Sequence, residues 1–286
     1  MAARGRDFWR ATVLLLTLAL LAGGVYTVVA FVQRSETLVS ERCTADVGTQ
    51  HAALATDQAV YASLITAVAV RRSLPPRAAS IALATAMQES KLRNIGHGDS
   101  AGPDSRGLFQ QRPSQGWGTE AQVMDPYYAT NAFYDALVKI PGYESLEITD
   151  AAQRVQRSAF PHAYTQHEVM GRSFASALSG QTPEAVQCIL RAPQESGAPD
   201  IVETELVQAY GALAIVTEGE VLVVQASGSH AWSVAQWAVA NAKQLAVTQV
   251  DVAGRSWLRQ DQAGWQVSDA ADGQVRITVA PAGTGN

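Results

Sequence analysis

The sequence predicts a mainly α-helical domain, preceded by one transmembrane helix and followed by a small α+β domain. Three observations carry this prediction: an uncharged apolar run near the N-terminus, helical patterns through the middle of the chain, and strand patterns after a polar linker. We expect the N-terminus and membrane anchor at residues 1–38, the helical domain at 39–190, the linker at 191–200 and the α+β domain at 201–286.

Composition limits the classes of function. The chain has 286 residues, 47% of them hydrophobic, which is enough for one or two packed cores. Its formal net charge of −5 provides no positive field to hold phosphates, so nucleic acid is not an expected partner. Neither a metal nor another cofactor is expected, because the histidines lack ligand spacing and two cysteines are too few for a zinc ribbon.

Residues 11–32 carry no charge and would span about 33 Å as a helix. Arginines at positions 4, 6 and 10 favour a cytoplasmic N-terminus, with the remaining domains extracytoplasmic. Val28-Val29-Ala30 would also suit a signal-peptide cleavage site, but the apolar run exceeds the usual ~7–15 residues of a signal peptide. We therefore expect a single-pass protein of the cell membrane, anchored through residues 11–32.

Cys43 and Cys188 stand at the two ends of the predicted helical domain. A disulfide persists outside the cell, and a bond between these residues would join the ends of one domain. Two unrelated buried thiols are the alternative. The flanking positions favour the disulfide.

Helical patterns follow one another at 44–72, 77–92, 126–139, 150–160 and 164–178, with Ser73 and Asp150 as candidate caps. The helix at 77–92 is apolar on nearly every face, which is typical of a buried central helix. Residues 94–119 contain six glycines and many short polar residues. This segment predicts a long structured loop or small hairpin region, and loops of such length are usually functional.

The pattern changes after residues 191–200. Strands are expected at 220–226 and 247–252, on either side of a helix at 232–245. A turn at Asp272-Gly273 then predicts a hairpin of two final strands. These elements form the small α+β domain, for which the sequence indicates no role.

Glu89 is the main catalytic candidate. It stands near the C-terminal end of the central helix, and residues one and two turns before it, such as Ala86 and Ala82, are small or apolar. A carboxyl group on such a face is poorly solvated. Its pKa is therefore expected to rise, as a general acid working near neutral pH requires.

Glu89-Ser90, followed by Gly107-Leu108-Phe109-Gln110, resembles the ES…GLMQ signature of soluble lytic transglycosylases and goose-type lysozymes, with Phe109 in place of Met. The longer strings ALATAMQESKLRN…GDSAGPDSRGLFQQRPSQGWGT and AAQRVQRSAFPHAY resemble an actinobacterial group of membrane-anchored cell-wall proteins. The resemblance spans Cys43 to Cys188. It implies a lysozyme-like fold, peptidoglycan glycan strands as the substrate, and Glu89 as acid and base.

The substrate-binding candidates are hydroxyl, amide and aromatic side chains around this motif, which suit the hydroxyl groups and flat faces of sugars: Ser90, Gln110, Gln111, Tyr127, Tyr128, Gln156 and Tyr164. The Tyr-Asn-Ala-Gly stretch of classical transglycosylases is missing. Residues 156–161, with Tyr164, are candidates for its place. Trp117, between two glycines, either lines the cleft or packs its loop onto the core.

Three functions stay open. In a lytic transglycosylase, Glu89 alone acts on the bond between N-acetylmuramic acid and N-acetylglucosamine, and the substrate's own hydroxyl closes an anhydro ring. In a hydrolytic muramidase a second carboxylate, Asp99 or Asp104, would activate water ~6.5–9.5 Å away, although both residues also suit turns. A non-catalytic peptidoglycan-binding or scaffold protein would instead meet cell-wall assembly proteins. We favour an enzyme over a binder, because a pure binder does not need a desolvated carboxyl group. Among the enzymes we favour the transglycosylase, because Asp99 and Asp104 suit turns better than catalysis.

Overall fold

The computed structural model describes residues 17, 23–24, 40–100, 102–157 and 162–282, in two compact units, Met1–Ser40 and Glu41–Asn286. Most of the predicted membrane segment, 11–32, lies outside the described residues. Among those described, no helix has the length and apolar character needed to span a membrane. A span needs about 20 apolar residues, and the helix α2 has 16. This finding contradicts the predicted single-pass anchor and the predicted location in the cell membrane.

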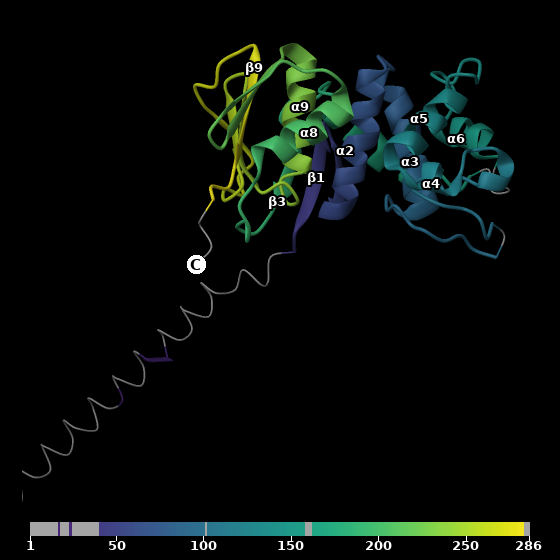
Figure 1. Ribbon diagram of the computed structural model, residues 1–286, viewed down its shortest axis with the longest axis horizontal. Coiled ribbons are helices and arrows are strands. Elements are labelled where there is room, and N and C mark those ends of the chain that lie inside the picture. The colour runs from purple at the N-terminus through teal and green to yellow at the C-terminus, as the bar shows by residue number, and fades with distance from the viewer. Residues whose placement is uncertain (1–16, 18–22, 25–39, 101, 158–161, 283–286) are drawn as a thin grey trace, which may run out of the picture. The chain divides into compact units, whose positions relative to one another are not determined.

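The second unit is a mixture of helices and sheets, so the predicted fold class is also wrong (Figure 1). Two antiparallel sheets accompany the helices, with strand orders β2-β1-β3 and β4-β5-β9-β6-β7-β8. The helices are α2 (Thr56–Arg71), α3 (Pro76–Ser90), α4 (Glu120–Met124), α5 (Pro126–Leu137), α6 (Ile148–Gln156), α7 (Glu168–Leu178), α8 (Pro199–Tyr210) and α9 (Gly228–Ala240). The strands are β1 (Arg42–Val47), β2 (Gln50–Ala55), β3 (Val186–Ile189), β4 (Ile215–Glu218), β5 (Val221–Gln225), β6 (Val247–Val252), β7 (Arg255–Leu258), β8 (Trp265–Val267) and β9 (Gln274–Val279).

The first sheet replaces the start of the helix predicted at 44–72. Strands β1 and β2 form a hairpin that turns at Gly48, whose φ of 60° suits glycine. Cys43 in β1 lies directly opposite Cys188 in β3, and the two buried residues form the predicted disulfide. Such a bond is typical of extracytoplasmic proteins.

Helix α3 is the buried central helix that the sequence predicts, and α7 crosses it closely. A Cβ atom on Gly171 of α7 would lie 2.7 Å from the carbonyl oxygen of Ser80, so this crossing requires glycine. The two predicted caps are wrong. Pro75 is the N-cap of α3, since Ser73 has a left-handed backbone, and Asp150 lies inside the first turn of α6.

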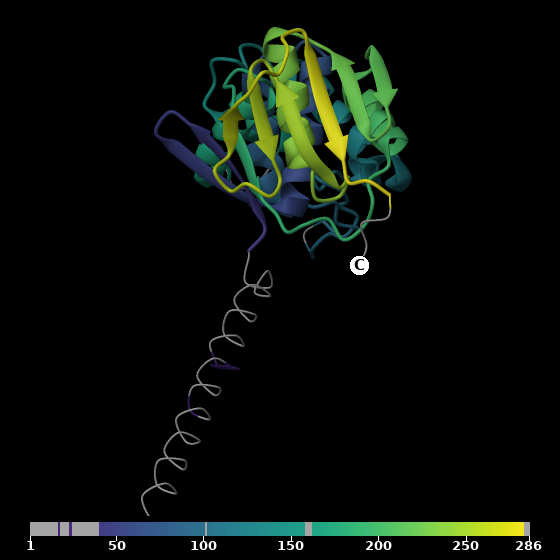
Figure 2. The same cartoon turned by 90° about the vertical axis from the view of Figure 1, so that its left-hand side faces the viewer.

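The second sheet is shown face-on in Figure 2. The predicted final hairpin at Asp272-Gly273 is wrong, because β8 pairs with β7 at the edge of the sheet whereas β9 lies between β5 and β6. Helix α9 packs on this sheet through β6 and β9. It also contacts α2, α7 and β3, which belong to the part of the unit that precedes residue 191. The buried surface of α9 is therefore divided between this earlier part and the second sheet.

Gln236 in the middle of α9 carries a buried polar link between these parts. Its Oε1 accepts hydrogen bonds from the backbone N–H groups of Ala185 (2.9 Å) and Val186 (2.7 Å). Its Nε2 donates to the carbonyl oxygens of Ala177 (2.6 Å) and Thr182 (3.0 Å). One side chain thus holds the segment that leads from α7 into β3.

Replacing Gln236 with alanine is expected to lower the free energy of unfolding by about 2–4 kcal/mol, because buried backbone groups lose their partners. Urea unfolding followed by fluorescence and circular dichroism measures this change. The matched control is Gln244→Ala, an exposed glutamine just beyond the same helix, which should cost less than about 0.5 kcal/mol. Equal losses in the two variants would contradict the role given to Gln236.

Candidate active site

The carboxyl group of Glu89 lies on the last turn of α3, in a largely buried position. Burial raises its pKa above the ordinary value of 4.5, and the nearby charge of Asp99 adds to this effect. Hydrogen bonds from Tyr164 and Gln156 act in the opposite direction, but burial dominates. Glu89 is therefore an acid that keeps its proton to a higher pH than an exposed glutamate does.

Tyr164 reaches Glu89 from the segment before α7. Its hydroxyl group is fully buried and donates to Oε1 of Glu89 at 2.8 Å. The short 3-10 helix that follows, Thr165–His167, is held against α3 by Gln88. The Oε1 of Gln88 accepts from Nε2 of Gln166 at 3.1 Å and lies 3.0 Å from Nε2 of His167. These contacts fix the position of Tyr164 beside the acid.

Gln156 is the last residue of α6, and its side chain forms a hydrogen bond with Glu89. Its Nε2 also donates to the carbonyl oxygen of Phe109 at 2.8 Å. The ring of Phe109 stacks on Phe133 of α5, with centroids 4.6 Å apart. Phe109, which stands where the resembling family has Met, therefore anchors the glycine-rich loop at the point that orients Gln156.

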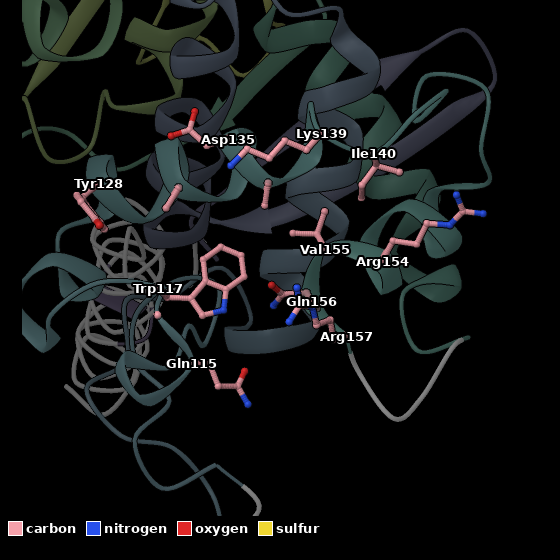
Figure 3. Close-up of a pocket in the computed structure, with 13 residues that line it drawn as sticks. Gln115, Trp117, Tyr128, Asp135, Lys139, Ile140, Arg154, Val155, Gln156 and Arg157 are labelled. Atoms are coloured by element: carbon pink, nitrogen blue, oxygen red, sulfur yellow. The ribbon is translucent and has the colours of Figure 1, made fainter.

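Two cavities lie beside the hydrogen-bonded pair of Glu89 and Gln156, one lined by each residue. The first, about 430 Å³, is called the acid cavity and is lined by Glu89, Ile95, His97, Gly98, Asp99, Gly102, Ser105, Gln110 and Arg112. The second, about 480 Å³, is called the Trp117 cavity (Figure 3) and is lined by Gln115, Gly116, Trp117, Tyr128, Ala132, Asp135, Ala136, Lys139, Ile140, Arg154, Val155, Gln156 and Arg157. The hydrogen bond between Gln156 and Glu89 therefore links a residue of the Trp117 cavity to the carboxyl group of the acid cavity.

The two candidates for a second carboxylate have different positions. Asp99 lines the acid cavity with Glu89, and its Oδ1 accepts from the backbone N–H of Gly102 at 2.9 Å. Asp104 is not among the residues that line this cavity. Hydrogen bonds from Ser114, and then from Arg112 at 2.9 Å, hold the pKa of Asp104 well below its usual range. Asp104 therefore braces the loop as an ionised turn residue.

The substrate-binding candidates divide into cavity-lining and buried residues. Gln110 lines the acid cavity, whereas Tyr128 and Gln156 line the Trp117 cavity. Tyr164 is buried against Glu89, so it orients the acid. Tyr127 packs partly buried against the hydrophobic core and lines neither cavity.

Ser90 and Gln111 do not line the cavities either. The buried hydroxyl of Ser90 donates to the carbonyl oxygen of Leu108 at 2.7 Å, which ties the loop to the end of α3. The buried Nε2 of Gln111 donates to the carbonyl oxygen of Ala129 at 3.0 Å, which ties the same loop to α5. Both side chains fix the loop in place, and they are corrected from substrate contacts to positioning residues.

The sequence interpretation missed several residues of the site. Trp117, which it left open, lines the second cavity. Arg112 follows Gln111 directly, so the motif that identified the glutamines could also have indicated it. Lys139 and Arg157 lie at the ends of α5 and α6, and only the fold brings these ends together. In the parts of the chain that the structure describes, no three histidine, cysteine, aspartate or glutamate side chains gather into a metal-binding group.

These contacts describe a desolvated acid that is held by two hydrogen-bond donors and lines a mainly polar cavity, with a second cavity of mixed polar and aromatic character lined by one of the donors. Each cavity has the volume of a pocket for a small organic group, in the range of about 300–1,000 Å³. A scan against protein-family models finds no match for this sequence, and a search of curated proteins finds no similar protein.

Proposed function

We propose that this protein is a lytic transglycosylase that cleaves the glycan strand of peptidoglycan between N-acetylmuramic acid and N-acetylglucosamine. The observation that carries the proposal is Glu89, a largely buried carboxyl group with a raised pKa that lines one cavity and is hydrogen-bonded to Gln156, which lines another. The resemblance of its motif to soluble lytic transglycosylases indicates peptidoglycan as the substrate. The disulfide supports a location outside the cytoplasm, where peptidoglycan lies.

The reaction needs one carboxyl group in two roles. Protonated Glu89 donates its proton to the bridging oxygen while the bond from this oxygen to C1 of the muramic acid ring breaks. The resulting carboxylate accepts the proton of the C6 hydroxyl group on the same ring, and the C6 oxygen bonds to C1. Glu89 is again protonated, no water is consumed, and the product ends in a 1,6-anhydro ring.

The surroundings of Glu89 suit this cycle. Tyr164 and Gln156 donate to the carboxylate, which stabilises the ionised form between the two proton transfers. Burial favours the protonated form at the start. These opposite effects keep the two forms close in free energy, as an acid that becomes a base requires. The aromatic rings of Trp117 and Tyr128 offer faces for sugar rings on one side of the acid.

Hydrolysis is the second candidate, and Asp99 favours it. This carboxylate lines the same cavity as Glu89. A hydrolytic muramidase would use Asp99 to activate a water molecule, which would add to C1 and leave a reducing end. The two reactions differ in the mass of their products by one water molecule.

We expect the purified protein to release soluble fragments from peptidoglycan, and we expect mass spectrometry to find anhydro ends on them. The Asp99→Asn variant should release the same products, because the transglycosylase cycle does not use a second carboxylate. Reducing ends that disappear in Asp99→Asn would instead support the muramidase. Binding to peptidoglycan without release of any fragment would contradict both reactions and leave the non-catalytic binder.

A further inference from the structure

We infer that the Trp117 cavity binds the carboxylate groups of the peptide stem carried by the muramic acid next to the bond that is cleaved. This inference rests on the proposed function, because it assigns a second binding site for the same substrate. It concerns a part of the substrate that the acid at Glu89 does not touch.

The charge of the cavity indicates an anionic ligand. Lys139, Arg154 and Arg157 line it, and within the described parts of the chain none of the three forms an ion pair. The one carboxylate in the lining, Asp135, already accepts a hydrogen bond from the guanidinium of Arg72 at 2.7 Å. A protein with a net charge of −5 therefore has a locally cationic cavity beside its acid.

The directions of these side chains separate their roles (Figure 3). Trp117 stands in the middle of the pocket, with Gln156 and Arg157 beyond one edge of its ring, and the chain of Lys139 runs across the top, with its nitrogen on the side of Asp135. The guanidinium of Arg154 points outward, away from Trp117. We assign one carboxylate to Arg157 and another to Lys139, and Arg154 is not part of the binding site.

The backbone of Arg157 supports this assignment. Arg157 is the C-cap of α6 and has a φ of 52°, in the left-handed region. Helix ends of this geometry favour glycine or asparagine, because a side chain adds steric cost there. A guanidinium at this position lies next to Gln156, which contacts Glu89 directly. The side chain of Gln156 thus lies between the proposed carboxylate site and the carboxyl group of Glu89.

The rest of the lining suits a short peptide. Trp117, Ile140 and Val155 are apolar, and Ala132 and Ala136 add small side chains. A peptide stem combines small aliphatic side chains with free carboxylates, so it can place methyl groups on the apolar wall and carboxylates on the cations. Guanidinium groups bind carboxylates with two parallel hydrogen bonds, which adds geometric selectivity. A neutral sugar chain makes no use of the two cations.

The test measures binding by calorimetry in the Glu89→Gln background, where no turnover occurs. The probes are a disaccharide carrying the tripeptide L-Ala-γ-D-Glu-L-Lys, the same compound with amidated carboxyl groups, and a neutral N-acetylglucosamine tetramer. Adding Arg157→Gln and Lys139→Gln should raise the Kd of the first probe at least tenfold, because hydrogen bonds to charged groups are lost. The Kd of the neutral tetramer should stay the same. The matched control is Arg154→Gln, a similar exchange on the same helix, which should not change either Kd.

Four results would overturn the inference, and a fifth would overturn the proposed reaction. The first is an amidated probe that binds as tightly as the probe with free carboxylates. The second is a neutral tetramer that loses as much affinity as the charged probe when Arg157 and Lys139 are replaced. Inorganic phosphate could also displace the charged probe at similar concentrations, which would assign the cavity to a phosphate group instead. Anhydro products from the wild-type protein with no effect of Arg157 and Lys139 would overturn this inference alone. Binding that depends on these cations, without any cleavage by the wild-type protein, would overturn the proposed reaction and leave the carboxylate site.

Discussion

The Glu89→Gln variant is expected to release peptidoglycan fragments at least about 10³-fold more slowly than the wild-type protein. General acid–base catalysis contributes roughly 10²–10⁴-fold in rate, and this reaction uses the same carboxyl group for both proton transfers. Glutamine keeps the size of the side chain but cannot donate or accept the transferred proton. Chromatography with mass detection of anhydro fragments measures the rate, and Glu203→Gln, an exposed residue on α8, is the matched control.

The same variant should fold, and it should be more stable than the wild-type protein at neutral pH. Glu89 ionises near 4.5 in the unfolded chain, but burial raises its pKa in the folded protein. The stability that its protonated form contributes is complete below pH 4.5 and is lost as the pH rises through the raised pKa. Glutamine cannot ionise, so the stability advantage of Glu89→Gln should grow with pH over this range. Urea unfolding at several pH values measures it.

These two measurements separate catalysis from folding. A variant that is inactive and also less stable at neutral pH would indicate a structural role for Glu89. Fragment release at the wild-type rate, from a variant of unchanged stability, would show that the proposed acid is not the catalytic group.

The Cys43→Ala/Cys188→Ala variant is expected to lose the largest amount of stability, about 5 kcal/mol in the chain-entropy model. The bond joins residues 145 positions apart, so its removal frees a very long loop in the unfolded chain. Native domains are stable by only about 5–15 kcal/mol. The variant should therefore unfold at much lower urea concentration and temperature, as followed by circular dichroism.

A single Cys43→Ala exchange provides the control for this loss. It breaks the same bond, so the double variant should add little to it, because the two effects share one interaction. Wild-type protein treated with a reductant under unfolding conditions should match both variants. A loss below about 1 kcal/mol would contradict the argument from loop length.

The sequence predicted the elements with a strong local pattern. Helix α3 is apolar on nearly every face and β6 is rich in valine, and the structure has both near the predicted positions. The sequence pattern of the β1–β2 hairpin predicts helix instead, because half of its buried residues are alanines, which suit either period. The order of the second sheet depends on β9 entering between β5 and β6, a pairing between distant segments that no local pattern contains.

The candidate site was predictable to a similar degree. Glu89 followed from the character of its own helix. Gln156 and Tyr164 were chosen as substrate contacts, but the structure shows that both donate to Glu89, since the ends of α6 and the segment before α7 meet there. The sequence does not indicate that Lys139 and Arg157 would line one cavity, because lysines and arginines at helix ends usually complement the helix dipole.

The link through Gln236 also determines when the segment from α7 to β3 can be fixed during synthesis. A chain is made from its N-terminus, at about 5–20 residues per second, so Glu89 is made well before Gln236. Until α9 is complete, the amide groups of Ala185 and Val186 lack the buried acceptor that Gln236 provides, and β3 is held by its pairing with β1 alone. The order of synthesis thus delays the fixing of this segment until most of the chain has been made.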